Sequence, residues 1–245
     1  MNSKPASGQN EVSSEVTAMQ QALTSLTHVI SHDLRAPLRA ISGFTDLLQQ
    51  QCAGKLDADA EHYLQRIQQS TQRLNQMLEG LTRLAQVSQA ELRLVPVDIS
   101  ALCQLLVTEL TDRYPQWSPA VSIAPGLFSC ADPTLIRSAL LELLDNAWKY
   151  SSNGHAARIE VTGAGIGNQV ELCVRDNGIG FDLQFARHLF APFQHFHAAS
   201  GLDGIGMGLA ITQRIISRHG GLLRVATSPQ QGAAFYCTLP AGNTL

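Results

Sequence analysis

Two adjacent side chains early in the chain, His32 and Asp33, pair a nucleophile with a group that can hold its second proton. A neutral imidazole nitrogen is a good nucleophile near pH 7. An adjacent carboxylate can bind the other ring N–H and stabilise the charge that the ring gains. Pro37 interrupts a helical hydrogen bond beside them, which costs about 3 kcal/mol in an ordinary helix. His32, Asp33 and Pro37 together favour a reactive histidine over the alternative, a solvated surface histidine. One point against it is that side chains of consecutive residues on a helix do not normally face each other.

A second set of polar side chains lies on a predicted helix over 133–150. Glu142, Asn146 and Lys149 are spaced by four and three residues, so they share one face of that helix. The apolar residues between them supply a core-facing side. A polar helix face normally points to solvent, so this spacing alone is not specific.

Two glycine-rich segments, 176–180 and 204–208, are typical of backbone that closely approaches a ligand. The second precedes a predicted helix, whose first N–H groups can bind phosphate. Neither segment matches GxxxxGK[ST] or GxGxxG, so the common P-loop and dinucleotide motifs are excluded.

Taken together and in this order, five segments resemble the conserved boxes of two-component sensor histidine kinases. Residues 31–41 resemble the H-box, in a variant common among phytochrome-like kinases. Residues 141–150 resemble the N-box and residues 176–180 the G1 box. Residues 190–193 resemble the F-box and residues 204–211 the G2 box. Each match is modest, but the ordered set covers roughly residues 25–240.

This resemblance implies a kinase that uses ATP and Mg²⁺. His32 would accept the phosphoryl group and Asp33 would assist it. Asn146 would be the Mg²⁺ ligand, a role that suits an amide oxygen. Asp176 would accept a hydrogen bond from the adenine amino group. The remaining nucleotide-binding positions that it implies are Glu142, Lys149, Tyr150, Gly178, Gly180, Phe193, Gly204, Gly206, Gly208 and Leu209. The segment 181–203 would be a mobile lid.

Two residues depart from the family pattern. Ala36 stands where many members have Thr or Asn, so we expect weak phosphatase activity toward a regulator. Glu142 stands where many have Asn, whereas gyrase-type ATPases of the same fold have Glu. An ATP hydrolase or conformational switch using Glu142 is therefore one alternative function. A non-catalytic dimerisation scaffold is another.

The first part of the chain, residues 11–90, has the pattern of a long helical hairpin. Apolar residues follow heptads over 23–48 and 64–88, and residues 51–57 supply a helix stop and a turn. One apolar seam cannot be buried by two helices alone, so we expect a homodimer that forms a four-helix bundle. His28, His32, Arg35 and Arg39 fall on the outer face. We expect His28, Arg35 and Arg39 to form a basic rim that meets an acidic face of a response regulator receiver domain.

After a linker at 91–98, the pattern changes to a domain over 99–242 with short strands and helices. Expected strands lie at 121–124, 157–162, 169–175, 222–227 and 233–239, and expected helices at about 98–112, 133–150 and 206–219. This pattern predicts an α/β two-layer sandwich, which the resemblance identifies with the gyrase and histidine kinase ATP-binding fold. Residues 1–10 are predicted to be disordered.

The composition fits a cytoplasmic protein. The chain has 245 residues, 44% hydrophobic, with a net charge of −3 and five cysteines without a CxxC pair. We therefore expect no nucleic-acid partner, no membrane insertion and no disulfide framework. About 25 residues precede the H-box region, so input would come from a separate sensor protein, or the chain is the end of a larger sensor.

Overall fold

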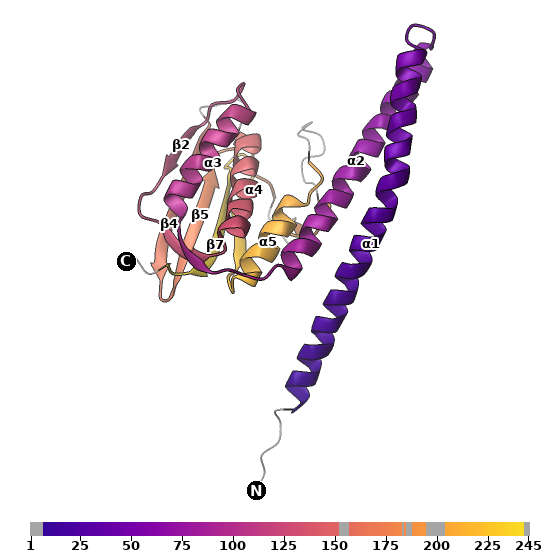
Figure 1. Ribbon diagram of the computed structural model, residues 1–245. Helices are drawn as coiled ribbons and strands as arrows, with labels where there is room; N and C mark the ends of the chain where they lie inside the picture. Colours follow the sequence, from indigo (N-terminus) through magenta and orange to yellow (C-terminus); the bar gives the residue numbers. More distant parts are fainter. Residues whose placement is uncertain (1–6, 152–156, 183, 185–187, 195–203, 243–245) are drawn as a thin grey trace. The chain divides into compact units, whose positions relative to one another are not determined.

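The computed structural model describes residues 7–151, 157–182, 184, 188–194 and 204–242, with side chains from residue 29 onward. The chain divides into two compact units, 1–89 and 90–245. Figure 1 shows a helical hairpin and a mixed α/β unit, which confirms the predicted fold class.

The first unit is a hairpin of α1 (Ser7–Gln51) and α2 (Ala58–Gln89). Gly54 takes a positive φ of 72° in the turn, and Asp57 Oδ1 accepts a hydrogen bond of 2.8 Å from the Ala60 N–H to cap α2. α1 runs through Pro37 and begins at Ser7, so the prediction of disorder was wrong for residues 7–10. Adding residues 7–10 to the end of an existing helix costs far less free energy than nucleating a new helix, so polar residues can continue α1.

The apolar seam predicted from the heptads is only partly buried within the hairpin. Ser31, Leu38 and Thr45 of α1 are buried, as are Thr71 and Leu78 of α2. The neighbouring apolar positions are 43–68% exposed in the single chain: Ile30, Leu34, Ile41, Phe44, Leu48, Ile67 and Leu74. The hairpin thus leaves a long apolar face uncovered, larger than the scattered exposed residues of an ordinary surface.

The second unit is built on a five-stranded sheet in the order β2-β4-β5-β7-β6. β2 (Ala120–Ile123) is parallel to β4 (Arg158–Ile166), and all other neighbours are antiparallel. The other three strands of this sheet are β5 (Gln169–Asp176), β6 (Leu223–Thr227) and β7 (Ala233–Pro240). Residues 158–162 of β4 alternate between exposed and buried side chains, because helices cover one face of the sheet.

Three helices form the covering layer (Figure 1): α3 (Ile99–Arg113), α4 (Pro133–Ser151) and α5 (Gly208–Arg218). α4 packs between the other two and against β4 and β5. Its apolar side, including Leu140, Leu143 and Leu144, is at most 1% exposed. This packing fixes the direction of the polar side chains on the rest of α4.

Part of the predicted linker is a strand. β1 (Val95–Asp98) pairs with β3 (Phe128–Ala131) in a separate two-stranded sheet, so the linker prediction was wrong for residues 95–98. Asp98 then caps α3 by accepting a hydrogen bond from the Ala101 N–H at 2.9 Å. Each of these strands has only four residues and β1 contains a proline, so neither carries a clear strand pattern.

A small polar network joins the start of α4 to two distant segments. Asp132 Oδ1 accepts from the N–H groups of Thr134 and Leu135 at 3.0 Å, and its Oδ2 accepts from the Arg93 N–H at 3.1 Å. The Asp132 N–H donates to Nε2 of buried His219 at 2.9 Å. Burial of the carboxyl raises its pKa, but the donors from Leu135, Arg93 and Thr134 outweigh burial and lower it.

Replacing Asp132 with Ala removes this cap, so we expect a loss of about 1–2 kcal/mol in the free energy of unfolding at pH 7. Because the native pKa lies below the unfolded value, the ionic part of the stabilisation is present above about pH 4 and is lost on acidification through the native pKa. Urea titrations followed by the two tryptophans, both in this unit, measure it. Asp132→Asn is the control, since Asn also caps helices; an equal loss in both variants at pH 7 would point to the charge alone.

Candidate functional site

The polar side of α4 divides between two directions. Glu142 and Asn146 are half-buried, whereas Asp145 is only 8% exposed. Asp145 Oδ1 accepts a hydrogen bond of 2.8 Å from the Tyr114 hydroxyl at the end of α3. The helix thus presents Glu142 and Asn146 on one side and Asp145 toward α3 on the other.

Lys149 lies close to this buried carboxylate. Its Nζ is 2.5 Å from Asp145 Oδ2, and the lysine side chain is 23% exposed. Burial lowers the pKa of Lys149, but Asp145 and Tyr114 more than offset this and raise the pKa, so the amine stays charged. The predicted nucleotide-binding lysine is therefore held beside an acid and a tyrosine that the sequence reasoning did not include.

Asp176, at the end of β5, is a buried acid held by backbone donors. It is 6% exposed, and its Oδ1 accepts from the N–H groups of Gly178 at 2.9 Å and Ala233 at 3.3 Å. Burial raises the pKa of the carboxyl to about 6, against the opposing effect of the two N–H groups. A carboxylate in such a place gains from a further hydrogen-bond donor.

The raised pKa has a consequence for stability. The native state binds a proton at Asp176 more tightly than the unfolded chain does, so this group stabilises the fold at low pH. That contribution falls as the pH rises from about 4 and is gone above about 6, where the buried group is ionised. Near neutral pH the site holds a buried charge that a ligand's donor can satisfy.

The segment after Asp176 packs directly against the end of α4. A Cβ at Gly178 would overlap the carbonyl oxygen of Tyr150 and lie 2.9 Å from the Ser151 nitrogen. The Ile179 N–H donates to that same Tyr150 carbonyl at 3.2 Å. Burial raises the pKa of the Tyr150 hydroxyl. Two predicted elements, the 176–180 segment and the α4 polar side, are therefore joined in one place.

The loop between β6 and β7, to which the sequence reasoning gave no part in the site, packs against the same segment. Gly180 has a φ of 55°, and a Cβ there would overlap the Ser228 carbonyl oxygen. A Cβ at Gly232 would overlap the Asp176 carbonyl oxygen, and the Gln230 N–H donates to Ile179 at 2.7 Å. The sequence signals for this loop are Ser228, Pro229 and Gly232, which lie between the expected strands 222–227 and 233–239.

The predicted F and G2 boxes are hydrogen-bonded to each other. The Phe193 N–H donates to the Gly206 carbonyl at 2.9 Å, and both residues have positive φ, 64° and 69°. A Cβ at Gly206 would lie 2.7 Å from the Gln194 nitrogen. Much of the expected lid, 183, 185–187 and 195–203, lies outside the described residues, so the lid stays a prediction.

The start of α5 brings Glu142 against a glycine. A Cβ at Gly208 would overlap Glu142 Oε2, so the missing side chain leaves room for this carboxylate. No side chain of the preceding Met207 caps α5. Leu209 is half-buried in the first turn, whereas Gly204 has open space around it. Helix N-termini of this kind favour negative groups.

In the hairpin, His32 and Asp33 are in contact. His32 Nδ1 is 3.2 Å from Asp33 Oδ1, and the two side chains are 77% and 72% exposed. With the proton on Nδ1, the lone pair is on Nε2.

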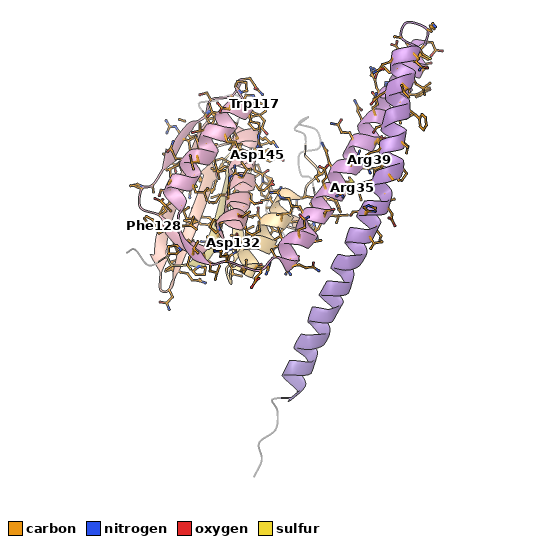
Figure 2. The ribbon with its side chains drawn as sticks, viewed as in Figure 1. Arg35, Arg39, Trp117, Phe128, Asp132 and Asp145 are labelled. Carbon is orange, nitrogen blue, oxygen red and sulfur yellow. The ribbon has the colours of Figure 1, made fainter. Side chains whose placement is uncertain are left out.

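Arg39 is exposed, but Arg35 is half-buried and donates to Thr82 Oγ1 at 3.2 Å. The prediction of an outward-facing Arg35 was wrong, because its long side chain crosses to α2; Figure 2 labels both arginines. His28 lies before the described side chains.

Two family models match this chain. The His Kinase A phospho-acceptor domain matches residues 22–90, and the histidine kinase-, DNA gyrase B- and HSP90-like ATPase matches 131–243. The chain belongs to the two-component histidine kinases, as their catalytic core.

Curated relatives agree with this assignment. The phytochrome-like protein Cph1 of Synechocystis sp. is 26% identical over 221 residues, which are 90% of this chain and 29% of Cph1. The adaptive-response sensory kinase SasA of a Synechococcus strain is 30% identical over 220 residues, 86% of this chain and 58% of SasA. The chain thus spans only about a third to three fifths of these relatives.

Solved structures share the fold. Full-length ShkA, crystallised with AMPPNP, has a TM-score of 0.65 and 26% identity, over 90% of this chain and 46% of ShkA. The histidine kinase AdeS of Acinetobacter baumannii is similar in fold, with a TM-score of 0.59 at 22% identity over 86% of this chain. Within the described residues, this kinase core contains no helix long and apolar enough to cross a bilayer.

The donors on α4 fit Mg²⁺. Glu142 lies against Gly208 at the start of α5, and Asn146 is half-buried one turn further along the same face of α4. Mg²⁺ is a hard cation that prefers oxygen ligands and shares them with phosphate groups. The residues present in the kinase core therefore suit the metal that the family implies.

Gly178→Ala should destabilise this unit and weaken nucleotide binding, because the new Cβ overlaps the Tyr150 carbonyl. We expect a loss of about 1–3 kcal/mol in the free energy of unfolding. Gly165→Ala is the matched control, since nothing lies within 4 Å of its Cβ. Urea unfolding and titration with a fluorescent ATP analogue check both. Equal stability of the two variants would mean that the close approach at Gly178 is not required.

Proposed function

We propose that this kinase core transfers the γ-phosphoryl group of ATP to His32 and then to an aspartate of a response regulator. The observation that carries the proposal is the exposed His32, with Nδ1 held 3.2 Å from Asp33. That contact favours the tautomer with an accessible Nε2 lone pair. The family assignment supports ATP as the phosphoryl donor.

The transfer is a simple displacement. Nε2 of His32 forms a bond to the γ-phosphorus while the bond from that phosphorus to the bridging oxygen breaks, and ADP leaves. The ring gains positive charge, and Asp33 holds the proton that remains on Nδ1. Such reactions depend mainly on positioning and on neutralising charge.

The residues of the second unit hold the nucleotide in this proposal. Asp176 accepts a hydrogen bond from the adenine amino group, and Gly178 and Gly180 let backbone approach the base. Asn146 and Glu142 hold Mg²⁺, which when bound neutralises phosphate charge. Lys149, the start of α5 and the segment 204–208 meet the phosphates, while Phe193 and Tyr150 border the site.

The partners follow from the hairpin and from the family. The uncovered apolar face of α1 and α2 supports a homodimer in which two hairpins form a four-helix bundle. Exposed Arg39 suits an acidic face of a receiver domain. Because the relatives extend beyond the matched region, sensory input comes from a separate protein or from further parts of a longer chain. Because the proposed reaction consumes ATP, we infer that this part of the chain works in the cytoplasm.

One observation favours a second candidate function. The carboxylate of Glu142 lies against the first residue of α5, close to where phosphate would bind, as a base for attacking water would. A gyrase-type ATP hydrolase would release free phosphate without labelling the protein. A non-catalytic scaffold would keep its biological function when Asp176 is replaced with Asn.

Incubation with γ-labelled ATP should place acid-labile, base-stable label on the protein, and His32→Gln should abolish it. His62→Gln is the matched control, because His62 is an exposed histidine on α2 of the same hairpin. Asp33→Asn should slow labelling about tenfold, less than the roughly hundredfold or larger loss typical of a general acid or base, because Asp33 only holds a proton that stays on the ring. Label that persists in His32→Gln, or free phosphate without label, would rule the kinase proposal out.

Adenosine should bind more weakly below about pH 6, because protonation of Asp176 removes the charged acceptor of the adenine amino group. Adenosine is chosen because it has no phosphate to titrate. Isothermal titration between pH 5 and 8 measures the effect, expected at about five- to tenfold. Asp176→Asn should bind weakly at every pH. A wild-type affinity that is flat over this range would contradict the assigned role of Asp176.

A further inference from the structure

The Lys149 ammonium is part of a cluster that links α4 to the end of α3. Asp145 accepts from Lys149 at 2.5 Å, from the Tyr114 hydroxyl at 2.8 Å and from Arg113 at 3.5 Å. The Asp145 side chain is 12% exposed. Leaving a carboxylate this buried without a partner would cost several kcal/mol, about 3–5 for a broken buried pair, so the pairing favours a Lys149 side chain that stays beside Asp145.

The opposite side of the cluster is held by several contacts at the end of α3. Tyr114 is the C-cap residue of α3, and its N–H donates to the Leu110 carbonyl at 2.9 Å. Its ring stacks on Trp117 with centroids 5.2 Å apart, and the Trp117 N–H donates to the Tyr114 carbonyl at 2.9 Å. Figure 2 labels Asp145 on α4 and Trp117 beyond the end of α3, in the same part of the unit. The hydroxyl that holds Asp145 therefore has a fixed position.

The neighbouring ion pairs are separate from the lysine. Arg113 also pairs with Glu109 at 2.8 Å, and Glu109 pairs with Arg137 of α4. These contacts tie α3 to α4 on a more exposed surface, and none of them includes Lys149. Arg137→Gln offers a control, because it removes the ion pair between α4 and α3 and leaves Arg113, which also contacts Asp145, with its partner Glu109.

We propose that Asp145 and Tyr114 are positioning residues that hold the Lys149 ammonium in place for the phosphates of the nucleotide. This inference rests on the proposed function, in which Lys149 meets the phosphates. A lysine side chain has four flexible carbons, so ordering it costs entropy when a ligand binds. Because Lys149 pairs with Asp145, its side chain is ordered when the protein folds and not when the nucleotide binds. An ammonium has three donors, so a bond to Asp145 is compatible with a bond to phosphate.

The same cluster keeps the amine charged in a half-buried place. Burial lowers the pKa of Lys149, and Asp145 and Tyr114 reverse that effect. Burial, with Asp145, also raises the pKa of the Tyr114 hydroxyl, so the tyrosine remains a donor. Neither residue touches the nucleotide in this proposal; both act through Lys149.

The test is a double-mutant cycle on the full chain with Asp145→Asn, Lys149→Ala and the two combined. Dissociation constants are measured for ATP, ADP and adenosine. We expect Asp145→Asn to weaken ATP and ADP about three- to tenfold and to leave adenosine within twofold. The double variant should bind ATP no worse than Lys149→Ala. Tyr114→Phe should give a smaller loss of the same kind, and Arg137→Gln none.

Three results would overturn the inference. Additive losses in the double variant would mean that Asp145 acts independently of Lys149. An equal loss of adenosine would indicate a general structural role. Unchanged or tighter ATP binding by Asp145→Asn would mean that the acid does not position the lysine, or competes with phosphate for it. A wild-type chain that binds no ATP would instead remove the proposed function, and this inference with it.

Discussion

The nucleotide half of this protein depends on one close approach, between the end of α4 and the segment that follows β5. The Tyr150 carbonyl accepts the Ile179 N–H, and Gly178 lies so near that no side chain fits. This contact places Asp176 beside the helix that carries Asn146 and Lys149. Without it, the acid and the polar side of α4 would belong to separate parts of the sheet and helix layers.

Around that contact, the fold satisfies buried polar groups with backbone. Asp176 is held by N–H groups of Gly178 and Ala233, and Asp132 by those of Thr134, Leu135 and Arg93. The two acids respond differently, because burial dominates at Asp176 and the donors dominate at Asp132. Asp176 can therefore still gain from a hydrogen-bond donor of a ligand, whereas Asp132 caps α4 and holds the fold together. The chemistry of the site thus comes from a difference in solvation between similar acids.

Much of the architecture could be predicted from the sequence, because long periodic segments carry a strong signal. The two hairpin helices, α4, and the strands β5 and β7 begin and end close to their expected positions, whereas β4 extends four residues past its expected end. The short strands β1 and β3 were missed, since four residues show no period and pairing with each other is what makes them strands. The outward direction of Arg35 was also wrong, because heptad position ignores how far a long side chain reaches.

The sequence by itself determined which residues are the candidates for the chemistry. His32, Asn146, Asp176 and the paired glycines lie in motifs whose order and spacing are specific, and the two family models match the same regions. Only the tertiary structure decided how those residues are held. The Tyr114 hydroxyl on Asp145, the loop at Gly232 against Asp176, and Glu142 against Gly208 all join positions far apart in the chain. Such contacts depend on packing between elements, which local sequence patterns do not encode.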